Sequence, residues 1–254
     1  MLELRDIRKS FGPVDVLNGI SISFQPGEIM SIVGPSGAGK TTLLKIAGTL
    51  DRPDSGEVIF NGENLLKLKD RKLSKFRNLN LGFVFQFHQL LPEFSALENV
   101  ALPALIAGKK RKTAFAEAQK WLIELGLSHR LNHKPSELSG GEKQRTAIAR
   151  ALINTPSIVM ADEPTGSLDS KNRDEIKGII SDLREKYNQS FVIVTHDPEI
   201  ADIADRKVLL EDGLIIDDGL SMPEANPEIS NAETPIFESS TSGISDDGLI
   251  EPEV

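Results

Sequence analysis

Residues 34–41 read Gly34-Pro35-Ser36-Gly37-Ala38-Gly39-Lys40-Thr41 and directly follow the apolar run Ile29–Val33. Every fixed position of the pattern G-x-x-x-x-G-K-[ST] is matched, which happens by chance roughly once in a hundred chains of this length. Residues 41–47 have helical character, so strand, loop and helix follow in the order that a phosphate loop requires. The stretch therefore predicts an anion site on an α/β core.

The chemistry of this loop predicts a bound nucleotide. The glycines let backbone N–H groups approach phosphates, and a helix that begins near Lys40 directs its positive dipole at them. The Lys40 side chain adds a positive charge for the β- and γ-phosphates, and the Thr41 hydroxyl can bind Mg²⁺. We therefore predict ATP and Mg²⁺ as the ligands of this loop.

Two further apolar runs end in polar residues that suit hydrolysis. Residues 157–161 predict a buried strand that ends in Asp162 and Glu163, and residues 191–194 predict another that precedes His196. Asp162 suits a Mg²⁺-holding carboxylate, and Glu163 is placed to polarise an attacking water. The ends of parallel strands meet at one edge of a sheet, which brings His196 near the same nucleotide, although a lone histidine is more often structural.

The remaining pattern predicts a largely parallel sheet with additions. Residues 2–7 and 20–24 alternate as half-buried strands, and residues 208–216 read as a hairpin closed by Asp212-Gly213. Residues 63–135 are richer in helical patterning, so they are expected to be insertions or edges on the core. The fold class predicted is α/β, with a mostly parallel sheet at its centre.

Bulk properties exclude several classes of protein. The apolar fraction of 39% and the charged fraction of 26% are typical of a globular chain, and the absence of cysteine excludes disulfides and thiolate metal sites. No apolar run is long enough to cross a bilayer, so another chain must supply any spanning part. Residues 217–254 carry ten acids and no base, which leaves 28 acids and 29 bases, a charge of +1, in residues 1–216. We find no strong basic block and predict no nucleic-acid partner.

A second anion site is predicted at Leu138-Ser139-Gly140-Gly141-Glu142. A serine and two glycines that open a helix suit an anion independently of the phosphate loop. Two such sites beside a single nucleotide loop suggest that two copies of the chain share nucleotides across an interface.

Together these elements resemble the nucleotide-binding subunits of ATP-binding-cassette (ABC) transporters, over residues 1 to about 216. The run Leu138–Glu142, followed by Lys143-Gln144-Arg145, is highly specific to that family. The resemblance implies a P-loop fold of the ABC type, with an N-terminal antiparallel β subdomain, a helical subdomain and a head-to-tail homodimer.

The resemblance also implies a role for each matching position. Glu163, His196 and Lys40 would be catalytic, with Asp162 and Glu163 as the Walker-B pair, while Thr41, Gln86 and Asp162 would bind or sense Mg²⁺. Ser139 and Gly141 would contact the γ-phosphate held by the other subunit, and Phe11 would stack on adenine. The ATP-binding residues implied are Phe11, Gly34, Pro35, Ser36, Gly37, Ala38, Gly39, Lys40, Thr41, Thr42, Gln86, Ser139, Gly140 and Gly141.

Within the family, residues 85–100 and 129–138 are most similar to the ATPases of lipoprotein-releasing systems. This implies a peripheral subunit at the cytoplasmic face of the inner membrane, bound to permease subunits that handle the lipoprotein cargo. Export of a macrolide or peptide and a cell-division role remain alternatives, because the run Ala161–Gly166 is shared with those ATPases. A soluble ABC protein acting on ribosomes or DNA is disfavoured by the single signature, and a non-hydrolysing cassette by the complete catalytic set.

We expect residues 1–218 to form the ATP-binding domain, with a helical subdomain at about 88–155. Residues 219–254 are expected to be an acidic, disordered tail, since Ser, Pro, Glu and Asp dominate there. A regulatory or docking role for this tail is the alternative.

Overall fold

The computed structural model describes residues 1–220 of the 254-residue chain, so the predicted acidic tail lies outside the described residues except for its first two positions. The centre of the fold is a six-stranded sheet in the order β10-β9-β3-β8-β7-β6. Its strands are β3 (Ile29–Val33), β6 (Leu81–Phe85), β7 (Ile158–Asp162), β8 (Ser190–Val194), β9 (Arg206–Glu211) and β10 (Leu214–Asp217). Neighbouring strands are parallel except for the hairpin of β9 and β10. The predicted parallel core and C-terminal hairpin are therefore confirmed.

A second, antiparallel sheet has the order β2-β1-β4-β5. It consists of β1 (Leu2–Phe11), β2 (Val14–Phe24), β4 (Ser55–Phe60) and β5 (Glu63–Asn64). The alternation in residues 2–7 and 20–24 predicts these strands but underestimates their length, because β1 and β2 continue into a hairpin with register shifts that break the alternation.

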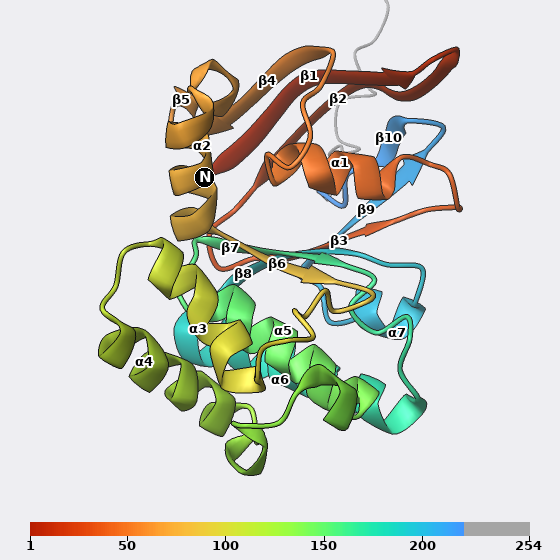
Figure 1. The fold of residues 1–254 in the computed structure, drawn as a ribbon. Coiled ribbons are helices and arrows are strands. Elements are labelled where there is room, and N and C mark those ends of the chain that lie inside the picture. The colour runs from red at the N-terminus through yellow and green to blue at the C-terminus, as the bar shows by residue number, and fades with distance from the viewer. Residues whose placement is uncertain (221–254) are drawn as a thin grey trace, which may run out of the picture. The chain divides into compact units, whose positions relative to one another are not determined.

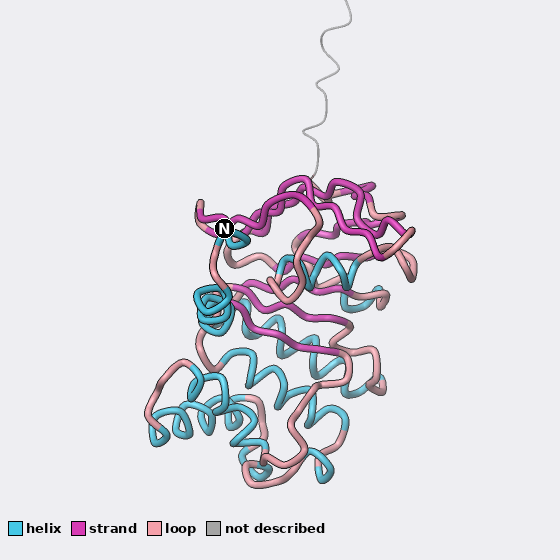
Figure 2. The backbone as a smooth tube through the Cα atoms, turned by 45° about the horizontal axis from the view of Figure 1, so that its top comes forward, coloured by secondary structure: helices cyan, strands magenta, loops and turns pink. Residues whose placement is uncertain are grey.

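The parallel sheet separates two apolar cores. Successive residues of a strand point to opposite faces, so Val159 and Phe191 join one core while Met160 and Val192 join the other. Helix α1 (Lys40–Ala47) packs in the core that also contains the antiparallel sheet. The opposite face is covered by α3 (Ala96–Ile106), α4 (Arg111–Glu124), α5 (Gly140–Leu152) and α6 (Ser170–Tyr187), as Figure 1 and Figure 2 show.

The remaining helices are α2 (Asp70–Asn80), which packs Phe76 edge-on against Phe60, and the short α7 (Pro198–Ala201). Three 3₁₀ turns lie at residues 65–67, 128–130 and 135–137. The predicted helical stretch 63–135 thus also holds two strands, β5 at its start and β6, and among residues 1–220 β6 pairs only with β7 at the edge of the parallel sheet. Within residues 1–220, none of the helices is both long and apolar enough to span a membrane.

Candidate active site

The phosphate loop joins β3 to α1 in a conformation that depends on glycine. Gly34, Gly37 and Gly39 have φ angles of 148°, 86° and 98°, in the region that disfavours residues with a side chain. A Cβ atom on Gly34 would overlap the backbone carbonyl oxygen of Leu210, on the neighbouring strand β9. Pro35, Ser36 and Gly37 form the exposed crest of the loop, and Ala38 is buried beneath it.

Lys40 opens α1 and is buried, with its Nζ donating to the carbonyl oxygens of Gly34 and Pro35 at 2.8 Å each. The ammonium group is thus held under the arch of the loop, where its charge reaches the space that phosphates would occupy. Thr41 and Thr42 follow in the first turn of the helix, whose free N–H groups and dipole favour an anion.

The Thr41 hydroxyl donates to Asp162 Oδ1 at 3.0 Å, which joins α1 to the end of β7. Burial raises the pKa of Asp162, the Thr41 hydrogen bond lowers it, and the charge of neighbouring Glu163 raises it again, with a net upward shift. A hydroxyl and a carboxylate are oxygen ligands of the kind that Mg²⁺ prefers, and a partly buried carboxylate gains most from a cation. The residues present therefore fit a magnesium ion.

Glu163 is held in one position by the adjacent strand end. Its Oε1 lies 2.7 Å from His196 Nδ1, and Thr195 Oγ1 donates to its Oε2 at 3.3 Å. Its φ of 47° is unusual for a residue with a side chain, and its N–H donates to the carbonyl of Val194 at 2.9 Å. Strain of this kind is concentrated at functional sites in proteins. The Glu163 side chain is 15% exposed, whereas the His196 side chain is 69% exposed.

Gln86 follows β6, the strand next to β7, and its side chain lies against the loop that follows Glu163. The side-chain Nε2 of Gln86 is 3.0 Å from the position that a Cβ on Gly166 would take. The backbone carbonyl oxygen of Gln86 accepts from Ser167 Oγ at 3.3 Å. The structure thus brings Thr41, Asp162, Glu163, His196 and Gln86 to the C-terminal edge of the parallel sheet, where ligands of α/β folds bind.

Phe11 stands apart from this cluster at the end of β1, where it is 53% exposed and has Lys9 Nζ 5.3 Å from its ring centre. The β1–β2 hairpin that carries Phe11 contacts the phosphate loop through Val16 of β2, which lies against Gly39. An exposed aromatic ring on a hairpin next to a phosphate loop is free to stack on a base.

The predicted second anion site begins α5. Ser139 caps the helix through a capping box with Glu142, in which each residue's side chain bonds the other's backbone N–H. Gly141 leaves no room for a Cβ atom beside Asn172, and Gly140 lies near Leu168. Helix α5 and helix α1 cover opposite faces of the parallel sheet (Figure 1), so Ser139, Gly140 and Gly141 do not join the phosphate loop of the same chain.

Two arginines in this region make contacts that the sequence did not predict. Arg150 of α5 donates to the carbonyl oxygens of Gln89 and His88 at 2.6 and 2.8 Å, which connects the segment after Gln86 to α5, the helix that begins with Gly140 and Gly141. Arg130 donates through Nε to Glu142 Oε1 at 2.8 Å. The sequence signal for Arg130 is weak, because only a buried acid at the helix start hints that a cation must approach it.

Glu142 is 8% exposed and keeps its charge because of these partners. Burial alone would raise its pKa, but hydrogen bonds from Ser139 and Arg130 outweigh it and lower the pKa of Glu142 from 4.5 to about 2. A depressed folded-state pKa stabilises the fold above pH 4.5, and this contribution is lost as the pH falls towards 2.

Replacing Arg130 with methionine should therefore lower the free energy of unfolding at pH 7 by about 1–3 kcal/mol, because it removes a charged hydrogen bond from a buried carboxylate. Urea unfolding from pH 7 down to pH 2.5 measures the difference between variant and parent, which should shrink below pH 4.5 as Glu142 becomes protonated. Arg71→Met, on an exposed position of α2, is the control. An equal and pH-independent loss in both variants would contradict this account.

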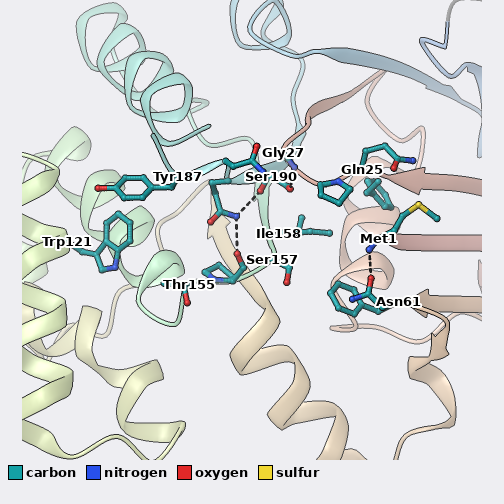
Figure 3. A pocket seen from close by; sticks show the side chains of 16 residues that line it. Met1, Gln25, Gly27, Asn61, Trp121, Thr155, Ser157, Ile158, Tyr187 and Ser190 are labelled. Carbon is teal, nitrogen blue, oxygen red and sulfur yellow. Dashed lines mark hydrogen bonds between the residues drawn. The ribbon is translucent and has the colours of Figure 1, made fainter. Parts of the chain in front are cut away.

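A cleft of about 490 Å³ lies at the opposite, N-terminal edge of the parallel sheet (Figure 3). Trp121, Tyr187 and Ser190 are among the residues that line it, and the Ser190 hydroxyl accepts from the N–H of Gly27 at 2.7 Å. None of the predicted site residues lines this cleft, so it belongs to a different part of the molecule.

Comparisons with known proteins agree with this geometry. The sequence profile of the family described as ABC transporter matches residues 17–166. The chain is 57% identical over 216 residues to the lipoprotein-releasing system ATP-binding protein LolD of Bacteroides fragilis, which covers 85% of this chain and 100% of that relative. Its counterpart in Geobacter metallireducens is 53% identical over 222 residues, which is 86% of this chain and 99% of the relative.

Solved structures of ATP-binding cassettes have a similar fold. A dimeric structure of an ATP-binding cassette in a post-hydrolysis state, bound to ADP and Pi, has a TM-score of 0.79 and 38% sequence identity. The superposition covers 86% of this chain and 97% of that chain, which confirms the predicted P-loop fold of the ABC type. The chain therefore belongs to the ABC transporter family, among its ATP-binding proteins.

Proposed function

We propose that this chain is the ATP-hydrolysing subunit of an ABC transporter that drives the release of lipoproteins from the inner membrane. The observation that carries the hydrolytic part is the Glu163 carboxylate, held by His196 and Thr195 beside Asp162. The cargo is supported by the relatives, which are lipoprotein-releasing ATP-binding proteins matched over their whole length. No feature of residues 1–220 favours the alternatives of macrolide or peptide export or cell division.

The phosphate loop binds the β- and γ-phosphates of ATP through its backbone N–H groups, and the dipole of α1 stabilises their charge. Lys40 turns its ammonium group from the two loop carbonyls towards the phosphates, while Phe11 stacks on the adenine. Thr41 and Asp162 would hold Mg²⁺, with Gln86 at the edge of the site, and the ion would supply charge neutralisation for the phosphates.

The hydrolytic step uses a water molecule between Glu163 and the γ-phosphate. The water oxygen attacks the γ-phosphorus in line, its proton passes to the Glu163 carboxylate, and the bond to the β–γ bridging oxygen breaks. His196 and Thr195 keep the two carboxylate oxygens in place, so that one of them faces the water. ADP and inorganic phosphate are then released.

The functional unit is a head-to-tail homodimer, because the signature residues Ser139, Gly140 and Gly141 begin a helix on the far face of the sheet from the chain's own phosphate loop. A second copy can present them to the γ-phosphate. Dimeric structures of related cassettes support this arrangement. ATP then joins the two copies, and hydrolysis releases them.

Membrane partners dock in a cleft of about 380 Å³ between α2, β6, α3 and α5. Its lining includes Leu50, Phe83 and Ile106, and Ile106 is 68% exposed. More exposed apolar side chains follow β6, with Phe87 exposed by 77%. Since Arg150 connects this segment to α5, which begins with Gly140 and Gly141, a partner bound here responds to closure of the dimer.

Replacing Ile106 with aspartate should weaken binding to the membrane subunits about tenfold or more, because an apolar anchor is lost and a charge is buried instead. Co-purification of detergent-solubilised partners measures this, and ATP hydrolysis by the isolated chain should stay within about twofold of the parent. Ile123→Asp, on an exposed position of α4 outside the cleft, is the matched control. Equal losses of partner binding in both variants would remove the cleft from this role.

The complete proposal is tested by reconstituting the chain with its co-purified membrane subunits in proteoliposomes. ATP-dependent release of an acylated lipoprotein to the outside supports it, and ATP-dependent uptake of a macrolide or peptide without lipoprotein release would contradict it. We further propose that residues 1–218 form the ATP-binding domain, with a helical subdomain at about 88–155, held at the cytoplasmic face of the membrane by the partners. The acidic segment 219–254 carries no part of this proposal.

A further inference from the structure

The near-zero charge of residues 1–216 conceals two local concentrations of positive charge. Residues 67–77 contain six bases and one acid, and residues 109–112 are four consecutive bases. The prediction that the chain has no strong basic block is therefore wrong on this local scale. The bases are Lys67, Lys69, Arg71, Lys72, Lys75 and Arg77 in the first segment, and Lys109, Lys110, Arg111 and Lys112 in the second.

Most of these bases are exposed and free of carboxylates. Lys67 lies 3.7 Å from Glu57, and Lys109 lies 2.6 Å from Glu117, so these two are neutralised in part. Within residues 1–220, no ion pair involves the exposed bases Lys69, Arg71, Lys72, Lys75, Lys110 and Lys112. Their charge therefore faces solvent without an internal partner.

Helix α2 sorts its side chains by face. Leu73 is buried and Phe76 packs edge-on against Phe60, with ring centres 5.0 Å apart, so this side of the helix faces the antiparallel sheet. Lys72 and Lys75 lie on the outer side, and Leu79, 37% exposed, lies between them by helical spacing. The outer side is thus a basic face with one apolar residue.

Both basic segments border the cleft proposed for the membrane partner. Ser74 and Asn78 of α2 line one wall of that cleft, and Ile106 at the end of α3 lines the other, three residues before the second segment. Asn78 Nδ2 donates to the carbonyl of Pro103 at 3.1 Å, which holds the two walls together. In Figure 1 and Figure 2, α2 and the turn between α3 and α4 lie on the same side of the molecule.

We propose that this basic rim, formed by residues 67–77 and 109–112, binds the anionic phospholipid headgroups that surround the membrane partner. The inference rests on the proposed docking of that partner in the neighbouring cleft, which brings the rim to the membrane surface. Each basic residue near an anionic surface strengthens binding roughly fivefold, and the effect vanishes beyond about 10 Å.

The charges of the whole chain make this binding depend on orientation. Residues 1–216 have a net charge of only +1, so most of their surface is not attracted to an anionic bilayer, and the face with concentrated positive charge is the one that approaches it most favourably. The rim therefore orients the subunit with its cleft towards the membrane before or while the partner binds. Spread lysines on a convex helix face suit many separate headgroups better than one buried phosphate.

The test measures sedimentation of the full-length chain, without partners, with vesicles of phosphatidylcholine containing 30% phosphatidylglycerol or none. We expect partition to the anionic vesicles at low salt, loss of it at 0.5 M NaCl, and a drop of about tenfold or more when Lys69, Arg71, Lys72 and Lys75 are all changed to glutamine. ATP hydrolysis by that variant should remain within about twofold of the parent, since none of the four residues lies at the candidate active site.

The control variant carries the same charge change on other faces, with Arg5, Arg8, Lys186 and Lys207 changed to glutamine, and it should bind the anionic vesicles like the parent. The proposal would be overturned if the chain bound neutral vesicles equally well, or if the control variant lost as much binding as the test variant. It would also be overturned if the chain bound a single-stranded RNA oligonucleotide and not anionic vesicles. Because the vesicles contain no partner, these outcomes are independent of the Ile106→Asp experiment, which tests the cleft and the proposed function.

Discussion

Replacing Glu163 with glutamine should lower the turnover number for ATP by about a hundredfold to a thousandfold, while ATP binding is retained. The amide keeps the shape of the side chain and its contacts with His196 and Thr195, but it cannot accept the proton of the attacking water. Phosphate release under steady-state conditions measures the turnover, and binding of a fluorescent ATP analogue measures the affinity. If ATP holds two copies together, the variant should also accumulate as a dimer in size-exclusion chromatography with ATP.

Glu185→Gln is the control, because it makes the same chemical change at an exposed position of α6. Its turnover should match that of the parent chain within about twofold. Near-normal hydrolysis by the Glu163 variant would remove Glu163 from its role as the base. A parallel loss of ATP binding would show instead that the carboxylate supports the shape of the phosphate loop.

The sequence alone predicts the position of those site residues whose surroundings are formed by nearby sequence. The apolar run Ile29–Val33, the glycine loop and the helix beginning at Lys40 form one continuous segment, so its pattern describes its own geometry. Asp162, Glu163 and His196 lie together because parallel strands end at one edge, which depends only on strand direction. Their catalytic roles stay predictions until variants are measured.

Features that depend on contacts between distant segments could not be read in this way. Strand β6 has five residues inside a stretch of helical pattern, and it becomes a strand because β7 offers a parallel edge more than seventy residues later. Helix α6 also went unpredicted, although three of its apolar residues reach the core. Arg130 is recognisable only once Glu142, twelve residues later in the chain, is seen buried beside it.

The basic rim could have been recognised from the sequence alone, but summing the charge over residues 1–216 concealed it. Charge acts over about 10 Å, so the relevant sum covers one helix face and not two hundred residues. Lys72 and Lys75 share a face because they lie three residues apart on α2, and the structure adds that this helix stands beside an open cleft.

Replacing Gly34 with alanine should lower the free energy of unfolding by about 3 kcal/mol or more and abolish measurable ATP binding. Its φ of 148° is strained for any residue with a side chain, and the added methyl group would overlap the Leu210 carbonyl. Since that carbonyl belongs to the backbone of β9, it cannot turn aside as a side chain would. Relief requires the phosphate loop to move away from the sheet, which displaces the N–H groups that would bind phosphate.

Gly37→Ala separates strain from overlap within the same loop. Gly37 also has a positive φ, of 86°, but nothing lies within 4 Å of the position of its Cβ. Its replacement should therefore cost only the strain, about 1 kcal/mol, and leave ATP binding detectable. Urea unfolding and ATP-analogue titration of the two variants give the comparison. A larger loss of stability in Gly34→Ala would show that contact with β9 holds the phosphate loop in place. Equal losses in both variants would show instead that the loop is held by its own conformation.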